Sequence, residues 1–255
     1  MLIKTFQNYE NFIFDLDGTV WHWTKLIKGA DKVFRELEKL NKNVFFLTNN
    51  CVLSRKGFAK KLTNFEIETN TEQIINPSLA AIKLLRGNKV FCVGEGIKDD
   101  LKKARIKITR HANAVLIAED RKLTFDKLVI ASNLIHQKTE FYKTARAGLW
   151  RVGKNMLPGT GAIAATIELT IGREAELIGK PSKHMVDVIK RFKLNPRKTA
   201  IFGDECKSDI ATGNKLNFTT VLVLTGYCSI EDYVASKGLE KPDMVLKSIP
   251  DIVKR

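Results

Sequence analysis

FIFDLDGT, residues Phe12–Thr19, joins an apolar run directly to two aspartates. The apolar residues at its start are typical of a buried β-strand, and Asp15 and Asp17 follow at the carboxyl end of that strand. Because side chains alternate between the two faces of a strand, the carboxylates would diverge unless the chain turned, which Gly18 allows. Two carboxylates in one small volume resist double ionisation unless a cation lies between them or they share a proton. An ordinary Asp-Gly turn after a core strand has the same letters, so this stretch alone leaves both interpretations open.

Three later segments contain groups of complementary chemistry. They are the hydrogen-bonding residues Thr48, Asn49 and Asn50 after the apolar run Val44–Leu47, the lysine Lys180 within Gly179–Ser182, and the acids Asp204, Glu205 and Asp209 after the apolar run Ala200–Gly203. Taken singly, these are polar strand caps, a lysine at a helix start and an acidic loop. Together with Asp15 and Asp17, they comprise a nucleophile, an acid/base, phosphate-binding donors, a cation and metal-binding carboxylates. Phosphoryl transfer to an aspartate requires such a set.

In this order, the four segments resemble the four motifs of the haloacid-dehalogenase-like phosphohydrolases. The pattern is similar to the NagD-like, para-nitrophenylphosphatase branch of that superfamily, and the similarity continues through Ile27–Ala30, Leu157–Gly161 and Val223–Gly226. The resemblance implies a Mg²⁺-dependent phosphatase that acts on a small phosphorylated metabolite: a sugar phosphate, phosphoglycolate, glycerol phosphate or a nucleotide. It also implies a phosphoaspartate intermediate.

The resemblance further implies a role for each motif residue. Asp15 would be the nucleophile, and Asp17 would protonate the leaving group and then accept a proton from water. The ligands of Mg²⁺ would be Asp15, the backbone carbonyl of Asp17, Asp204 and, as a close acidic supporter, Asp209. The residues that bind the substrate phosphate would be Thr48, Asn49, Asn50 and Lys180. Lys180 would also offset negative charge in the transition state, whereas Glu205 is interpreted as a solvated bystander.

Strands and helices are expected to alternate at both ends of the chain. The expected strands are Phe12–Asp15, Val44–Leu47, Thr199–Gly203, Thr220–Leu224 and Met244–Leu246, and the expected helices are Ala30–Asn41, Arg55–Phe65, Ser182–Phe192, Ile210–Leu216 and Ile230–Lys237. Continuous apolar strands with helices between them favour a parallel sheet covered on both faces. The ligand crevice of such a sheet lies beyond the carboxyl ends of its strands, where the motif acids would lie. We therefore expect an α/β fold whose core is a Rossmann-like doubly wound parallel sheet.

The middle of the chain has an alternation of its own, with strands expected at Lys89–Gly94 and Ala114–Ala118 and helices at Ile97–Ala104 and Phe125–Leu134. By the resemblance, this part is a large inserted α/β cap domain over residues 79–176. The core domain would then consist of residues 1–78 and 179–255. The larger caps of the family sit over the active site and select the substrate.

The cap departs from its relatives in one basic loop. Relatives usually carry Thr-Asn-Pro-Asp where this chain has Thr144–Ala147, and no acid occurs from Phe141 through Ile167. The basic residues of this loop are Lys143, Arg146, Arg151 and Lys154. Either the loop has diverged and faces solvent, or it recognises negative charge on the substrate beyond the phosphate.

The 255-residue chain has a formal net charge of +15. Basic and acidic residues mix along helices such as Asp31–Asn41 and no nucleic-acid-binding pattern occurs, so the charge is interpreted mainly as solvated surface. A milder interpretation is that the positive field attracts anionic substrates. No apolar run approaches the length of a membrane span, and the amino terminus has no signal-peptide pattern. The cysteines lack metal-ligand spacing and fit the free thiols of a reducing cytoplasm.

These features predict a cytoplasmic enzyme whose partner is a small phosphorylated metabolite rather than nucleic acid or a membrane. A homodimer formed through the cap is compatible with the resemblance. The alternative function is a non-catalytic, receiver-like phosphoryl-binding domain, because receivers also have acidic strand ends and a phosphorylated aspartate. The second acid of the first motif and the long cap favour turnover. Trp21 and Trp23, which follow that motif, either wall the substrate entrance or pack against the cap.

Overall fold

The computed structural model describes residues 1–136, 138–152 and 155–254. The chain divides into two compact units. The core unit contains Met1–Thr48, Ala59–Ile75 and Val186–Arg255, and the cap unit contains Asn49–Phe58 and Asn76–Met185. The domain limits expected from the resemblance, 1–78 with 179–255 and 79–176, stay a prediction.

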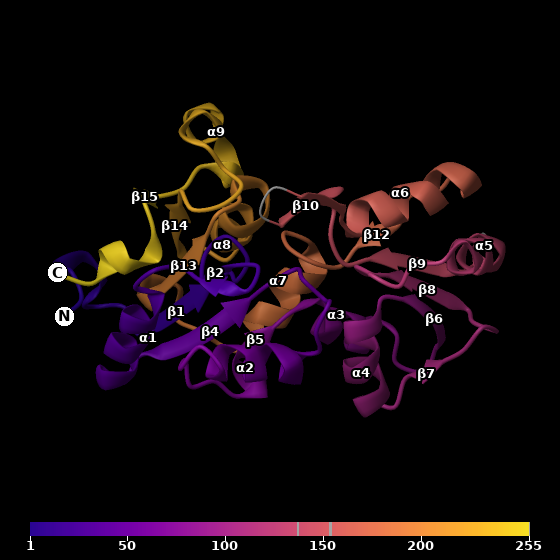
Figure 1. Ribbon diagram of the computed structural model, residues 1–255, viewed down its shortest axis with the longest axis horizontal. Coiled ribbons are helices and arrows are strands. Elements are labelled where there is room, and N and C mark those ends of the chain that lie inside the picture. Colours follow the sequence, from indigo (N-terminus) through magenta and orange to yellow (C-terminus); the bar gives the residue numbers. More distant parts are fainter. Residues whose placement is uncertain (137, 153–154, 255) are drawn as a thin grey trace. The chain divides into compact units, whose positions relative to one another are not determined.

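Within the described residues, the core unit holds a six-stranded parallel sheet in the order β15-β14-β13-β1-β4-β5 (Figure 1). Its strands are β1 (Asn11–Phe14), β4 (Asn43–Leu47), β5 (Ile74–Ile75), β13 (Thr199–Gly203), β14 (Thr219–Val223) and β15 (Met244–Leu246). The chain builds outward from β1 through β4 and β5, and later adds β13, β14 and β15 on the other side of β1. The strand order therefore reverses between β1 and β13, and ligands bind beyond the carboxyl ends of the strands at such a point. The expected Rossmann-like, doubly wound α/β fold is confirmed.

Aromatic side chains fill the centre of this sheet's packing. Phe12, Ile13 and Phe14 of β1 are all fully buried, so both faces of the strand are covered. The ring of Phe14 stacks on Phe202 of β13 at a centroid distance of 4.8 Å and meets the edge of Phe34 at 5.1 Å. A central strand buried on both faces is apolar without alternation, which explains the FIF run.

Helices form at each of the places expected in the two end segments, but with earlier ends. They are α1 (Ala30–Lys39), α2 (Arg55–Thr63), α7 (Lys183–Lys190), α8 (Ala211–Lys215) and α9 (Ile230–Ala235). The expected helix Ala30–Asn41 ends at Lys39 because Asn41 adopts a left-handed conformation with φ 51°. Lys193 (φ 52°) and Asn217 (φ 56°) likewise follow α7 and α8. A π-helical turn, Cys206–Ile210, precedes α8, so the expected helix at Ile210 starts later than predicted.

The cap unit contains a second parallel sheet, in the order β12-β9-β8-β6-β7. Its strands are β6 (Lys89–Val93), β7 (Lys107–Ile108), β8 (Ala114–Ile117), β9 (Glu140–Lys143) and β12 (Glu176–Leu177). Its helices are α3 (Pro77–Leu84), α4 (Glu95–Lys103), α5 (Phe125–Leu134) and α6 (Thr160–Ile171). An apolar cluster joins β6, β8 and β9 to α5 and α6, with Val115, Phe141 and Ile163 among its members. This sheet also reverses its strand order, between β6 and β8.

Several short elements carry no periodic signal and were not expected. They include β5, β7 and β12 and the antiparallel pairs β2 (Trp21–His22) with β3 (Lys25–Leu26) and β10 (Leu149–Val152) with β11 (Asn155–Pro158). The two-residue strands among them are too short to show alternation, so neighbouring strands define them rather than their own sequence. Among the described residues, no helix has the length and apolar character needed to cross a bilayer.

Candidate active site

Three buried carboxylates meet beyond the carboxyl edge of the core sheet. Asp15 follows β1, Asp204 follows β13, and Asp209 lies in the π-helical turn after it. Among the described residues, one carboxylate oxygen of each lies within 4.8 Å of the others. The three residues are between 2% and 7% exposed. Three of the four acids expected to converge therefore do so with their side chains.

Backbone amides orient two of these carboxylates. The amide of Tyr227 donates to Oδ2 of Asp204 at 2.7 Å, and the amide of Glu205 donates to Oδ2 of Asp209 at 3.1 Å. The Asp204 carbonyl also accepts the amide of Cys228 at 2.9 Å. Because each amide N–H donates along one direction, these contacts fix the orientation of the two carboxylates.

Two glycines allow the chain to approach Asp204 closely. Gly18 adopts φ +86°, and a Cβ added there would lie 2.4 Å from Oδ2 of Asp204. A Cβ at Gly226 would lie 1.8 Å from the same oxygen. The hydroxyl of Thr225 donates to the Gly18 carbonyl at 2.6 Å and so ties this second loop to the first motif. Any larger residue at Gly18 or Gly226 would displace the Asp204 carboxylate.

Asp17 lies at the same edge, and its side chain contacts a tryptophan. The indole Nε1 of Trp21 donates to Oδ1 of Asp17 at 2.8 Å. Trp21 is fully buried, so it does not wall an entrance. Its role as a hydrogen-bond donor could not be recognised from the sequence, because the pairing depends on how the chain folds back after Gly18.

The remaining phosphate-binding candidates fall into both units. Thr48 directly follows β4 in the core unit and is 2% exposed. In the cap unit, Oδ1 of Asn49 accepts the amide of Lys180 at 2.6 Å, and Nδ2 of Asn49 donates to the Lys180 carbonyl at 3.2 Å. A Cβ at Gly179 would lie 1.9 Å from the Thr144 carbonyl, which accounts for glycine before the buried Lys180. The phosphate-binding roles of Thr48, Asn49, Asn50 and Lys180 stay predictions.

The donor set of the acid cluster fits a hard divalent cation. All three side chains offer oxygen, they are buried, and their negative charges would repel one another at this spacing. Mg²⁺ prefers carboxylate oxygens and water, and it is held by few protein ligands. Asp15, Asp204 and Asp209 could therefore hold Mg²⁺.

Two residues beside the cluster have contacts that bear on their expected roles. The backbone amide of Glu205 contacts the cluster through its hydrogen bond to Asp209. The bystander assignment of its carboxylate stays a prediction. Cys206 is buried, and burial, followed by the neighbouring Cys228, raises the pKa of its thiol to about 12. The amide of Cys206 donates to Sγ of Cys228 at 3.1 Å.

The segment expected to be a basic loop is partly strand, because Lys143 ends β9 and Arg151 lies in β10. The ammonium of Lys143 pairs with Glu168 of α6 at 2.8 Å, so this charge is already compensated. Glu168, the first acid after the acid-free stretch, is thus a partner of Lys143 that the sequence did not suggest. Arg146 is exposed. The side chain of Arg151 and all of Lys154 lie outside the described residues.

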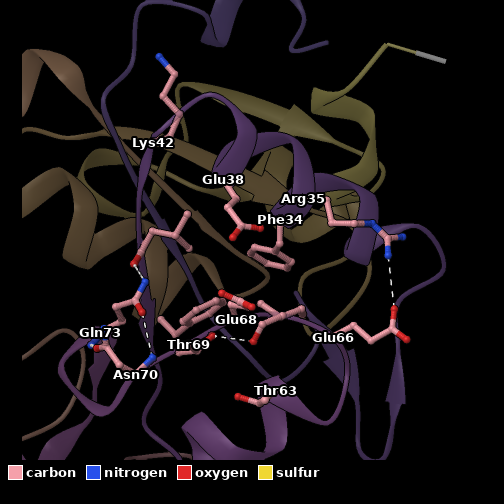
Figure 2. A pocket seen from close by; sticks show the side chains of 13 residues that line it. Phe34, Arg35, Glu38, Lys42, Thr63, Glu66, Glu68, Thr69, Asn70 and Gln73 are labelled. Atoms are coloured by element: carbon pink, nitrogen blue, oxygen red, sulfur yellow. Dashed lines mark hydrogen bonds and ion pairs between the residues drawn. The ribbon is translucent and has the colours of Figure 1, made fainter.

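The core unit also contains a separate cavity of about 550 Å³ (Figure 2). It lies between α1 and the segment that leads to β5, with Phe34 and Phe46 in its lining and Glu38 and Glu68 beside them. An ion pair between Arg35 and Glu66, with 3.4 Å between nitrogen and oxygen, spans its rim. None of the polar motif residues lines this cavity, so it is distinct from the acid cluster.

Comparison with protein families gives two matches that together span both ends of the chain. The family described as haloacid dehalogenase-like hydrolase matches residues 12–107, and the one described as HAD-hydrolase-like matches residues 177–252. The chain belongs to the haloacid-dehalogenase-like hydrolases. The matched ranges contain the first, second, third and fourth motifs, including every member of the acid cluster.

Known proteins place this hydrolase in the NagD-like, para-nitrophenylphosphatase branch. The solved structure of 4-nitrophenylphosphatase from Thermotoga maritima superposes with a TM-score of 0.87 at 26% identity, covering 97% of each chain. Phosphoglycolate phosphatase 2 of Arabidopsis thaliana is 27% identical over 98% of this chain and 94% of its own length. A 5′-nucleotidase of Bacillus subtilis is 26% identical over 96% of this chain and 98% of its own length. The chain is accordingly a phosphatase, which leaves the receiver-like alternative without support.

Proposed function

We propose that this phosphatase is Mg²⁺-dependent and hydrolyses a small phosphorylated metabolite through a phosphoaspartate on Asp15. The observation that carries the proposal is the buried cluster of Asp15, Asp204 and Asp209 at the point where the strand order reverses. Acids alone would be unfavourable at this spacing, and a divalent cation relieves that repulsion.

The proposed reaction has two steps at phosphorus. An Oδ of Asp15 attacks in line, the bond between phosphorus and the leaving oxygen breaks, and Asp17 delivers its proton to that oxygen. Water then attacks the acyl phosphate, Asp17 takes the proton of the water, and the bond between phosphorus and Asp15 breaks. Mg²⁺ held by Asp15, Asp204, Asp209 and the Asp17 carbonyl would neutralise part of the negative charge. By family resemblance, Thr48, Asn49, Asn50 and Lys180 bind the phosphoryl oxygens.

The proposed substrate class is a small phosphate monoester. The names of two relatives refer to phosphoglycolate and to 5′-nucleotides, which share little beyond that ester. Sugar phosphates and glycerol phosphate belong to the same class. A panel of these compounds, assayed with Mg²⁺, identifies the preferred member.

Hydrolysis of 4-nitrophenyl phosphate by the purified protein tests the proposal. Activity should disappear in EDTA and return with added Mg²⁺. Asp15→Asn should lower kcat by at least about 10⁴-fold, as removal of a covalent nucleophile does in other enzymes. Acid quenching during turnover should trap a phosphoryl group on wild-type protein and none on Asp15→Asn. Unchanged turnover by Asp15→Asn would rule out the proposed nucleophile.

A further inference from the structure

Trp21, four residues after Asp17 in the chain, contacts this proposed acid/base. The indole N–H of Trp21 donates to Oδ1 of Asp17 at 2.8 Å, and the ring is fully buried. Tryptophan has no other hydrogen-bonding group in its side chain, so a buried indole N–H normally finds one acceptor. Here that acceptor is the carboxylate that must exchange protons twice in each turnover.

The backbone fixes Trp21 beside Asp17. After the first motif the chain folds back, and the Leu16 carbonyl accepts the amides of Val20 at 2.8 Å and Trp21 at 3.1 Å. In return, the amide of Gly18 donates to the Trp21 carbonyl at 2.8 Å. The donor and the acceptor of the indole bond thus belong to one closed loop. A loop of this kind restrains the Asp17 carboxylate before any substrate binds.

Lys61 of α2 fixes the ring itself. Its ammonium lies 3.7 Å from the centroid of the Trp21 ring, within the range of a cation–π contact. The same ammonium donates to the Trp23 carbonyl at 2.7 Å. The ring is therefore held over its face by a cation and at its edge by Asp17. A cation over an indole face also makes its N–H a stronger donor.

We propose that Trp21 is a positioning residue for Asp17, with Lys61 supporting its ring. The inference rests on the proposed acid/base role of Asp17. The indole bond holds Oδ1 and with it the direction of the Asp17 carboxylate. Rotation of the carboxylate away from the leaving oxygen is prevented before substrate binds, and removal of the indole N–H loses this preorganisation.

Phenyl phosphate and 4-nitrophenyl phosphate test this inference as a matched pair. The two esters are similar in shape, but phenolate needs protonation as it leaves far more than 4-nitrophenolate does. The ratio of their kcat/KM values reports phosphoryl transfer to Asp15 and excludes the later hydrolysis step. Trp21→Phe keeps an aromatic ring and removes the donor. It should lower kcat/KM for phenyl phosphate by about tenfold to a hundredfold and for 4-nitrophenyl phosphate by less than about threefold.

Three other variants separate the outcomes. Asp17→Asn should also lower kcat/KM for phenyl phosphate more than for 4-nitrophenyl phosphate, and by a larger factor than Trp21→Phe does. Lys61→Met should show a smaller selective loss, and Trp23→Phe, which removes a neighbouring indole, should leave the ratio unchanged. If Asp17→Asn lacks the selective loss, the acid role in the proposed function is wrong. If Asp17→Asn has the loss and Trp21→Phe does not, only the positioning role is wrong. Partial unfolding of Trp21→Phe would lower both rates equally and cancel in the ratio.

A spectroscopic measurement tests the contact even if Trp21→Phe does not fold. The chain has three tryptophans, so ¹⁵N-labelled indole signals are few enough to assign with single variants. The Trp21 indole signal should shift in Asp17→Asn and exchange slowly with solvent in the wild-type protein. An indole signal that is indifferent to Asp17→Asn would overturn the inference.

Discussion

The carboxyl edges of the two parallel sheets both gather buried acids, but the acids have different neighbours. In the cap unit, Glu119 and Asp120 follow β8; Glu119 pairs with Arg121 at 3.2 Å, and Asp120 pairs with Lys127 at 2.8 Å. In the core unit, Asp15, Asp204 and Asp209 lie within 4.8 Å of one another. The cap acids lie beside the chain's own cations, and the core acids lie beside one another.

This difference separates a structural role from a chemical one. A buried acid opposite a lysine or arginine is satisfied in the folded chain, and its removal mainly costs stability. Buried acids opposite one another destabilise the fold and are kept where a cation or a reaction uses them. The same strand-end position in two sheets can therefore serve two purposes, and the partners of the carboxylate decide which.

The largest expected difference between the two edges is the loss of activity when one acid of each is neutralised. Asp204→Asn should lower kcat/KM for 4-nitrophenyl phosphate on the order of 10³-fold, since a catalytic metal ion supplies several kcal/mol of charge stabilisation. Asp120→Asn should keep the rate within about threefold of the wild-type rate, because its carboxylate binds Lys127 and the Gly94 amide. Steady-state kinetics at saturating Mg²⁺ measure both. Comparable losses in the two variants would mean that the edges do not differ in function.

Thermal unfolding with and without Mg²⁺ tests the charge argument without using catalysis. At a Mg²⁺ concentration of 100 times its Kd, the wild-type protein should gain about 2.7 kcal/mol of stability. Asp209→Asn should raise Tm in EDTA, because one repelling charge is gone, and it should reduce the gain from Mg²⁺. Asp120→Asn and Glu205→Gln should retain the full gain. A Tm that does not respond to Mg²⁺ in any variant would contradict the metal site.

The cap acid should have its own pH signature. Burial raises the pKa of Asp120, but hydrogen bonds from the Lys127 side chain and from the Lys122 and Gly94 amides outweigh burial, and its pKa lies below the ordinary value. A lowered pKa stabilises the fold above the ordinary value, and this contribution is lost as pH falls through the lowered pKa. Asp120→Asn should therefore cost about 1–3 kcal/mol near pH 7. The Tm difference from wild type should shrink below about pH 4. A difference that stays constant from pH 7 to pH 3 would contradict the lowered pKa.

Much of the core edge was predictable because the sequence itself encodes it. The run Phe12–Phe14 shows a strand covered on both faces, and Asp15 and Asp204 end neighbouring strands at the reversal point of the sheet. Parallel strands present their carboxyl ends at one edge, so acids separated by nearly the whole chain could be expected together. The resemblance to the family then added Asp209.

Side-chain contacts that form only when the chain folds back on itself could not be predicted from the sequence. The bonds between Trp21 and Asp17 and between Lys143 and Glu168 join residues whose types allow many other partners. The sequence around Trp21 does not show whether its side chain lines the substrate entrance or is buried as a hydrogen-bond donor. The short strand β5 is likewise defined by its pairing with β4, because two residues show no alternation.

The smallest expected effect concerns the two described cations of the basic cap loop. Lys143 is compensated by Glu168, whereas Arg146 is exposed and has no ion pair with the residues that the structure describes. If Arg146 recognises charge beyond the phosphate, Arg146→Ala should raise KM about two- to fivefold for phosphoglycolate and leave KM for 4-nitrophenyl phosphate unchanged, as loss of one exposed ion pair would. Lys143→Met should change Tm rather than this selectivity. Equal KM changes for both substrates in Arg146→Ala would show that Arg146 does not recognise charge beyond the phosphate. Neither Lys143 nor Arg146 would then contribute to substrate selectivity.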